Sequence, residues 1–141
     1  MKVGHEDDVL KFLGAVQRVD VRSALDMQAA VTAHVAVASV FVATAAVADW
    51  RVADVSEQKI KKQDPGQLPQ LSFVENPDIL ADVAHSARAQ SGALYCVGFA
   101  AESHDLLKHA TAKRERKGVP LLVGNIGPAT FGLDDNALLL V

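Results

Sequence analysis

The sequence predicts an α/β fold, in which a mostly parallel sheet lies between helices. One observation is that short apolar runs alternate along the chain with segments that carry helix-capping signals. Another is that Val40–Ala45 and Leu94–Phe99 are continuous apolar runs, which is typical of strands buried in a parallel sheet. Because parallel neighbours need crossover helices, we expect one Rossmann-like three-layer sandwich.

Caps and breakers place the individual elements. The expected elements, in order, are a strand at 19–21, a helix over 24–36, strands at 40–45 and 71–75, a helix from Pro77, a strand at 94–99, a helix from Ser103 to Lys117, and strands at 121–123 and 137–141. Ser23, Asn76 and Ser103 are the expected N-caps, and Gly118 ends the last helix. Residues 46–70 form a long connection, and a connection of this length is usually functional or disordered.

Composition and charge limit the classes of function. Half of the 141 residues are hydrophobic and 22% are charged, which is typical of a globular domain. The net charge of −3 argues against a general nucleic-acid binder. The stretch between Asp26 and Asp49 has no formally charged residue, but it changes from helical to strand character midway, so we predict no membrane span. The single cysteine, Cys96, cannot form an internal disulfide, which fits a reducing cytoplasmic location.

Three polar segments carry the groups that a polyanionic nucleotide needs. The run Lys59–Lys62 holds three lysines, which repel each other unless solvent or an anion screens them. Asn76 begins a helix directly after a strand, where backbone N–H groups can meet an anion. Asp49 follows another strand, and its carboxylate can hold a ribose hydroxyl or a metal ion. The alternatives are a solvated charge run, an ordinary helix start and an exposed turn acid.

Other candidates are weaker. Phe99 is expected to close its strand, where its ring can flank a base or simply pack in the core. Lys113 and Lys117 share a helix face, and both also suit the negative end of a helix. The five histidines show no ligand-like spacing, so we assign no metal to side chains, and Cys96 is expected to be an inert core residue. Because Gly-x-Gly-x-x-Gly, P-loop and Gly-x-Ser-x-Gly motifs are absent, dinucleotide-binding, P-loop and serine-hydrolase functions lack support.

The motifs also form an ordered set that covers about residues 19–140. The segments of this set are Val19–Met27, Ala45–Arg51, Lys59–Lys62, Asn76–Leu80, Val97–Glu102, Lys113 to Lys117, and Phe131–Gly132 through Asp135–Asn136. Each segment is unspecific alone, but their order and spacing together resemble phosphopantothenate–cysteine ligase. That ligase is the synthetase half of the bifunctional coenzyme A biosynthesis flavoprotein.

The resemblance implies an enzyme that joins 4′-phosphopantothenate to cysteine with CTP and Mg²⁺. The substrate carboxylate would attack the α-phosphorus of CTP and release pyrophosphate, and the cysteine amine would then attack the acyl-cytidylate and expel CMP. By matching position, Lys59 would be the catalytic lysine. The implied nucleotide contacts are Ala43, Thr44, Ala45, Asp49, Lys59, Pro77, Asp78, Ile79, Leu80, Phe99, Lys113 and Lys117. The resemblance also implies a homodimer, and a separate flavin-dependent decarboxylase domain linked to it in the full-length protein.

The chain departs from the family pattern at both ends. Residues 1–18 match neither the family's first strand and glycine-rich turn nor its asparagine-containing segment, so they are left unassigned. We therefore expect 19–141 to be a partial ligase domain, truncated at both ends. Gly124-Asn125-Ile126 stands where many members have Ala-Asn-Asp. A non-catalytic nucleotide-binding or assembly fragment is the alternative to an active ligase.

Overall fold

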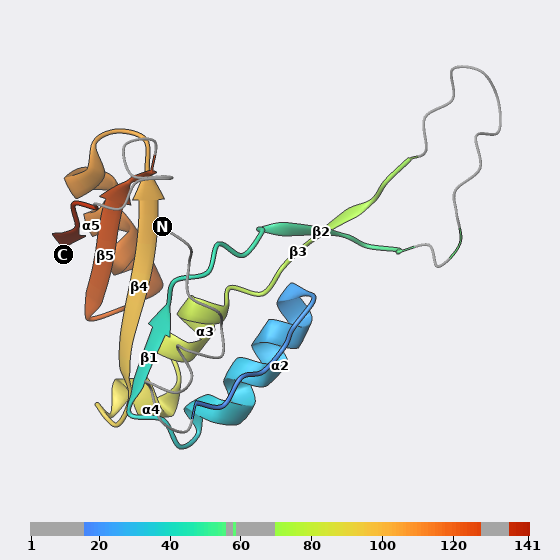
Figure 1. Ribbon diagram of the computed structural model, residues 1–141, viewed down its shortest axis with the longest axis horizontal. Coiled ribbons are helices and arrows are strands. Elements are labelled where there is room, and N and C mark those ends of the chain that lie inside the picture. The colour runs from blue at the N-terminus through green and yellow to red at the C-terminus, as the bar shows by residue number, and fades with distance from the viewer. Residues whose placement is uncertain (1–15, 56–57, 59–69, 128–135) are drawn as a thin grey trace, which may run out of the picture.

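The computed structural model describes residues 16–55, 58, 70–127 and 136–141. The described elements, in chain order, are α2 (Ala24–Val35), β1 (Val40–Ala43), β2 (Trp50–Val52), β3 (Phe73–Glu75), α3 (Ile79–Ala84), α4 (Ala87–Gln90), β4 (Tyr95–Glu102), α5 (Leu106–Lys117), β5 (Leu121–Ile126) and β6 (Leu139–Leu140). Four strands form the main sheet in the order β1-β4-β5-β6. The pairs β1–β4 and β4–β5 are parallel, and β6 is antiparallel to β5 (Figure 1). The predicted α/β fold with a mostly parallel sheet is confirmed.

One face of this sheet carries the core. Because side chains alternate along a strand, Cys96, Gly98 and the paired Leu122 share the face on which α3 and α5 pack. A Cβ atom at Gly98 would lie 2.9 Å from Leu80 Cδ2, and one at Gly124 would lie equally close to a leucine of α5. Glycine at these two positions therefore lets both helices approach the sheet closely.

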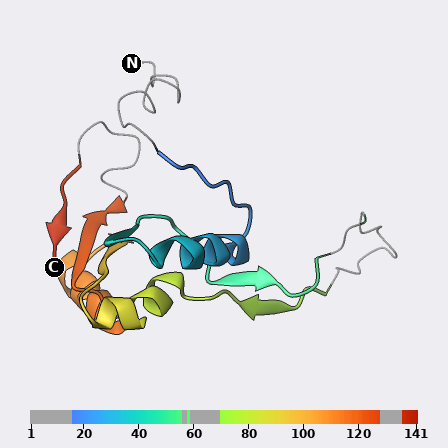
Figure 2. The ribbon, with the colours of Figure 1, turned by 90° about the horizontal axis from the view of Figure 1, so that it is seen from below.

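The core cluster joins helices to strands. Its buried members are Ile79, Val83, Ala84, Leu94, Cys96, Ala100, Ala110, Val119 and Leu122. Helix α2 lies beside α3 and adds half-buried apolar side chains to the cluster (Figure 2). Cys96 is 1% exposed, and desolvation raises the pKa of its thiol, so the predicted core role is confirmed.

Several predicted boundaries differ from the structure. Residues 19–21 form no strand and are largely exposed. The strand expected at 40–45 ends at Ala43, and its residues are exposed or half-buried in alternation rather than fully buried. The central strand β4 shows the same alternation, because α3 and α5 pack on one face of the sheet. The strand expected at 94–99 starts one residue later and runs on to Glu102.

The long connection expected over residues 46–70 contains strand β2, which the sequence pattern does not predict. Strand β2 pairs antiparallel with β3, and this hairpin projects away from the main sheet (Figures 1 and 2). At its base, Asn76 donates its backbone N–H to the Asp49 carbonyl at 2.7 Å and its side-chain amide to the Ala48 carbonyl at 2.8 Å. Trp50 and Phe73 are 60% and 59% exposed, so the hairpin presents large apolar side chains to solvent.

The signals at the start of α2 and the end of α5 worked as predicted. Ser23 Oγ accepts a hydrogen bond from the Asp26 N–H, and the Asp26 carboxylate accepts one from the Ser23 N–H, so the two residues form a capping box. These hydrogen bonds, together with one from the Arg22 N–H, lower the pKa of Asp26. Gly118 ends α5 with a φ of 68°, a conformation that glycine adopts without a Cβ clash. None of the helices in the described ranges has the length and apolar character needed to cross a bilayer.

Candidate functional site

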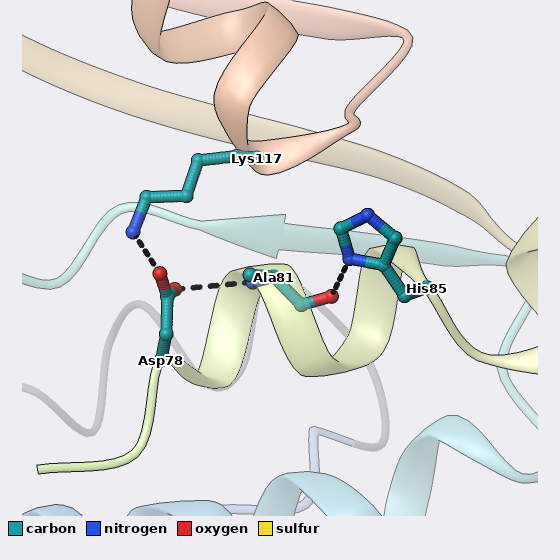
Figure 3. A network of polar contacts seen from close by, with 4 residues as sticks. All are labelled: Asp78, Ala81, His85 and Lys117. Carbon is teal, nitrogen blue, oxygen red and sulfur yellow. Dashed lines mark hydrogen bonds and ion pairs between the residues drawn. The ribbon is translucent and has the colours of Figure 1, made fainter.

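The start of α3 meets the end of α5 through two of the predicted site residues. Asp78 caps α3 by accepting a hydrogen bond from the Ala81 N–H at 3.1 Å, and its other carboxylate oxygen pairs with Lys117 Nζ (Figure 3). At the other end of α3, His85 Nδ1 lies 2.7 Å from the Ala81 carbonyl, and the His85 ring fills the space beside Gly118. The two helices thus meet at both ends of α3, and the Asp78–Lys117 pair joins residues 39 positions apart in the sequence.

The Asp78–Lys117 pair is partly shielded from water. The Lys117 side chain is 19% exposed and that of Asp78 is 46% exposed. Desolvation alone would raise the pKa of Asp78, but the hydrogen bonds from Lys117 and the Ala81 N–H outweigh it. The nearby charges of Lys117 and Arg116 act in the same direction. The net result is a pKa for Asp78 below its ordinary value, so this carboxylate is ionised at neutral pH.

The end of β1 lies near the same junction. Ala43 pairs in register with Gly98, and Leu80 of α3 packs against that glycine. Thr44 and Ala45 follow as exposed residues. Predicted site residues from three separate segments are therefore brought to one region of the fold.

Asp49 is held close to this region by the base of the hairpin. Its carbonyl oxygen accepts from the N–H of Asn76, two residues before Asp78. The predicted cap role of Asn76 is wrong, because its side chain is used at the hairpin base. There its amide oxygen also accepts from Arg51 Nη1 at 3.2 Å. Since Asp78 already occupies the start of the six-residue α3, an anion here would meet Lys117, the ion-pair partner of Asp78, rather than free N–H groups of the helix start.

Other predicted site residues lie differently from what was expected. Phe99 is interior to β4 and does not close the strand, and strand alternation directs it to the face opposite Gly98. Ile79 is 8% exposed and packs in the core, so only its backbone can meet a ligand. Pro77 and Lys113 are half-buried, with Lys113 one turn before the end of α5. Lys59 and the lysines at 61 and 62 lie outside the described residues.

Sequence spacing missed one cluster of polar side chains. His104, Asp105 and His109 each offer a ligand atom, and these atoms all lie within 4.8 Å of one another. The two histidines are five positions apart, whereas residues on one helix face are three or four positions apart. They meet in the fold because His104 lies in the turn before α5 and His109 lies in its first turn. Only a correct prediction that α5 begins after Asp105 would have brought them together.

Comparison with known proteins places these features in a family. The family model described as "DNA/pantothenate metabolism flavoprotein C-terminal domain" matches residues 7–141. The coenzyme A biosynthesis bifunctional protein CoaBC of Escherichia coli K12 is 44% identical over 127 residues, covering 87% of this chain and 30% of that protein. The protein of the same name from Mycobacterium bovis is 43% identical over 131 residues, with coverages of 86% and 31%.

The structural comparison agrees with the sequence comparisons. A crystal structure of the C-terminal domain of the coenzyme A biosynthesis bifunctional protein CoaBC matches with a TM-score of 0.63 and 28% identity. The match covers 86% of this chain and 50% of that chain. The chain thus spans about a third of the length of these curated relatives.

Proposed function

Because this chain belongs to the family of the DNA/pantothenate metabolism flavoprotein C-terminal domain, we propose that it acts in coenzyme A biosynthesis by joining 4′-phosphopantothenate to cysteine with CTP. The observation that carries the proposal is the contact between Asp78 and Lys117 beside the end of β1. It supports a shared nucleotide site because these residues come from segments far apart in the sequence.

The proposed chemistry develops negative charge on phosphate oxygens. When the substrate carboxylate attacks the α-phosphorus of CTP, pyrophosphate leaves and an acyl-cytidylate forms, and attack by the cysteine amine then releases CMP. Lysine side chains stabilise such charge best when they are already positioned. Lys117 is positioned by Asp78, and Lys59 is proposed to act on the phosphates as the catalytic lysine. The backbone at residues 43–45 is proposed to lie beside the nucleotide.

The proposal includes Mg²⁺ bound with the nucleotide. Mg²⁺ prefers oxygen ligands and is commonly held by phosphate oxygens together with one or two carboxylates. The side chain of Asp49 fits that role, since it is exposed and its residue is held at the hairpin base by the backbone N–H of Asn76. When bound, the ion would neutralise charge on the phosphate oxygens.

The decisive variant is Lys59→Ala. We expect the wild-type chain to release CMP from CTP only when phosphopantothenate is present, and the variant to lose about 100-fold of that rate. Its free energy of unfolding should change by less than about 0.5 kcal/mol, because a lysine in a connection contributes little to folding. Lys108→Ala, which removes an exposed lysine of α5 away from the Asp78–Lys117 junction, is the matched control and should retain the rate.

The alternative is a nucleotide-binding or assembly fragment without turnover. Ile126, which stands where many family members have an aspartate, favours this alternative, since an acidic group is missing there. Calorimetry with CTP separates the two functions: binding without CMP release favours the fragment. If Lys59→Ala changed neither binding nor turnover, the assignment of the site would be wrong.

We also propose that the chain forms a homodimer through the β2–β3 hairpin. Large exposed apolar side chains on a projecting hairpin are typical of a surface covered by a partner. In sedimentation equilibrium, the double variant Trp50→Ser/Phe73→Ser should weaken self-association at least about tenfold relative to the wild type. Leu107→Ser is the control, because Leu107 is 62% exposed on α5, away from the hairpin. Equal association of all three proteins would contradict the proposal.

A further inference from the structure

The turn between β4 and α5 contains a group of metal-ligating side chains that the proposed function does not use. Strand β4 ends at Glu102, and α5 begins at Leu106, so His104 and Asp105 lie in the turn and His109 on the first turn of the helix. Their three ligand atoms lie within 4.8 Å of one another. The imidazole rings of His104 and His109 stand edge to face, with centroids 5.2 Å apart.

The backbone at Asp105 is shaped in an unusual way. Asp105 has φ 46° and ψ 41°, the left-handed conformation that side chains other than glycine rarely adopt. It occupies the N-cap position of α5, yet its carboxylate makes no capping hydrogen bond. The residue thus bears the cost of the strained conformation while its side chain stays available beside the two histidines.

The remaining polar contact of the cluster restrains one of its rings. Ser103 Oγ lies 2.9 Å from His104 Nδ1, so the ring is held by a hydrogen bond from outside the cluster. Ligating histidines are commonly oriented in this way by a second polar group. Although His104 and Asp105 are exposed and His109 is half-buried, the three side chains are held by one turn and the helix that follows it.

We propose that His104, Asp105 and His109 bind one divalent transition-metal ion, of which Zn²⁺ is the expected example. Two imidazole nitrogens and a carboxylate oxygen are the ligand types that Zn²⁺ prefers, and water would complete the coordination. Ligand atoms on one tetrahedral ion lie about 2.0–2.2 Å from it and about 3.4 Å from one another. The exposed side chains therefore need to close by up to about 1.4 Å from their separations of at most 4.8 Å. The bound ion would fasten the start of α5 to the end of β4.

Calorimetry with Zn²⁺, in the absence of nucleotide and on the full chain without an affinity tag, tests the site. The wild type should bind one ion per chain. His104→Asn and Asp105→Gly should each weaken binding at least about tenfold. Asp105→Gly is chosen because glycine adopts the left-handed conformation readily, so loss of binding cannot come from a strained turn. His34→Asn, which changes an exposed histidine at the end of α2, should leave binding unchanged.

A spectroscopic measurement gives a second readout. Co²⁺ in place of Zn²⁺ should give the visible absorption of a four-coordinate ion with nitrogen and oxygen ligands, and Asp105→Gly should abolish it. The proposal is overturned if the wild type binds no ion. It is equally overturned if His34→Asn weakens binding as much as His104→Asn does, since that result would indicate unspecific binding to surface histidines.

Discussion

Helices α3 and α5 both begin with an aspartate, but they use it in opposite ways. Asp78 at the start of α3 has φ −83° and accepts a hydrogen bond from the first turn. Asp105 at the start of α5 has φ 46° and makes no capping hydrogen bond. The same residue type at the same position thus stabilises one helix and is strained at the other. Its carboxylate is committed to the fold in α3 and available for a ligand in α5.

Removing each carboxylate in turn tests this difference, and it should give the largest change in the free energy of unfolding. Asp78→Ala should lower the free energy of unfolding by about 1 kcal/mol, because it deletes a cap. Asp105→Gly should raise it by about 0.5 kcal/mol in metal-free buffer, because glycine relieves the left-handed strain. Urea unfolding followed by circular dichroism measures both changes. If both variants were destabilised to the same degree, the two helix starts would not differ as described.

The two helix starts also show why local sequence rules misplace the caps of α3 and α5. Asn76 and Ser103 were the expected caps, and in both helices the true cap lies two residues later. Local cap preferences do not distinguish these positions, since Asn, Ser and Asp are all favoured. At α3 the choice depends on the hairpin base, which engages Asn76 through the Ala48 carbonyl. That contact spans 28 residues and is invisible to a local rule.

Where local signals and long-range contacts favour the same structure, the sequence predicts that structure correctly. Ser23 forms its capping box with Asp26, three residues ahead, and Gly118 ends α5 without help from elsewhere. The parallel sheet was predicted from apolar runs such as Leu94–Phe99. Strand β2 has only three residues, which is too short for an alternating pattern to show. Its partner strand also lies about twenty positions away, so no tight-turn signal joins the two strands.

The candidate site was predicted in part, for a similar reason. Motif order identified Asp78 and Lys117, which touch in the fold although their spacing gives no sign of it. Phe99 was misplaced because its strand runs three residues further than expected, which makes it an interior residue. The histidines of the metal-ligating cluster were set aside because one precedes the helix and the other lies within it.

The smallest expected effect concerns the pH dependence of the α3 start. The pKa of Asp78 is lower in the folded chain than its ordinary value of 3.8, so the ionised form favours folding. This contribution is fully present above that value and is lost as the pH falls through the folded-state pKa. Asp78→Asn should therefore flatten the decline of unfolding free energy between about pH 5 and about pH 2.

Lys117→Met tests whether the lysine lowers the pKa of Asp78. It should remove part of the same pH dependence, because the Ala81 N–H still lowers the pKa of Asp78 when the lysine is gone. Some slope should persist even in Asp78→Asn, since Asp26 also has a lowered pKa in its capping box. The effect is small because Asp78 is 46% exposed and water screens the pair. Urea unfolding of the three proteins at pH 5, 4 and 3 should rank the slopes as wild type, then Lys117→Met, then Asp78→Asn. If the wild-type slope were no steeper than that of Asp78→Asn, the Asp78 carboxylate would not stabilise the start of α3. The contrast with Asp105 at the start of α5 would then be wrong.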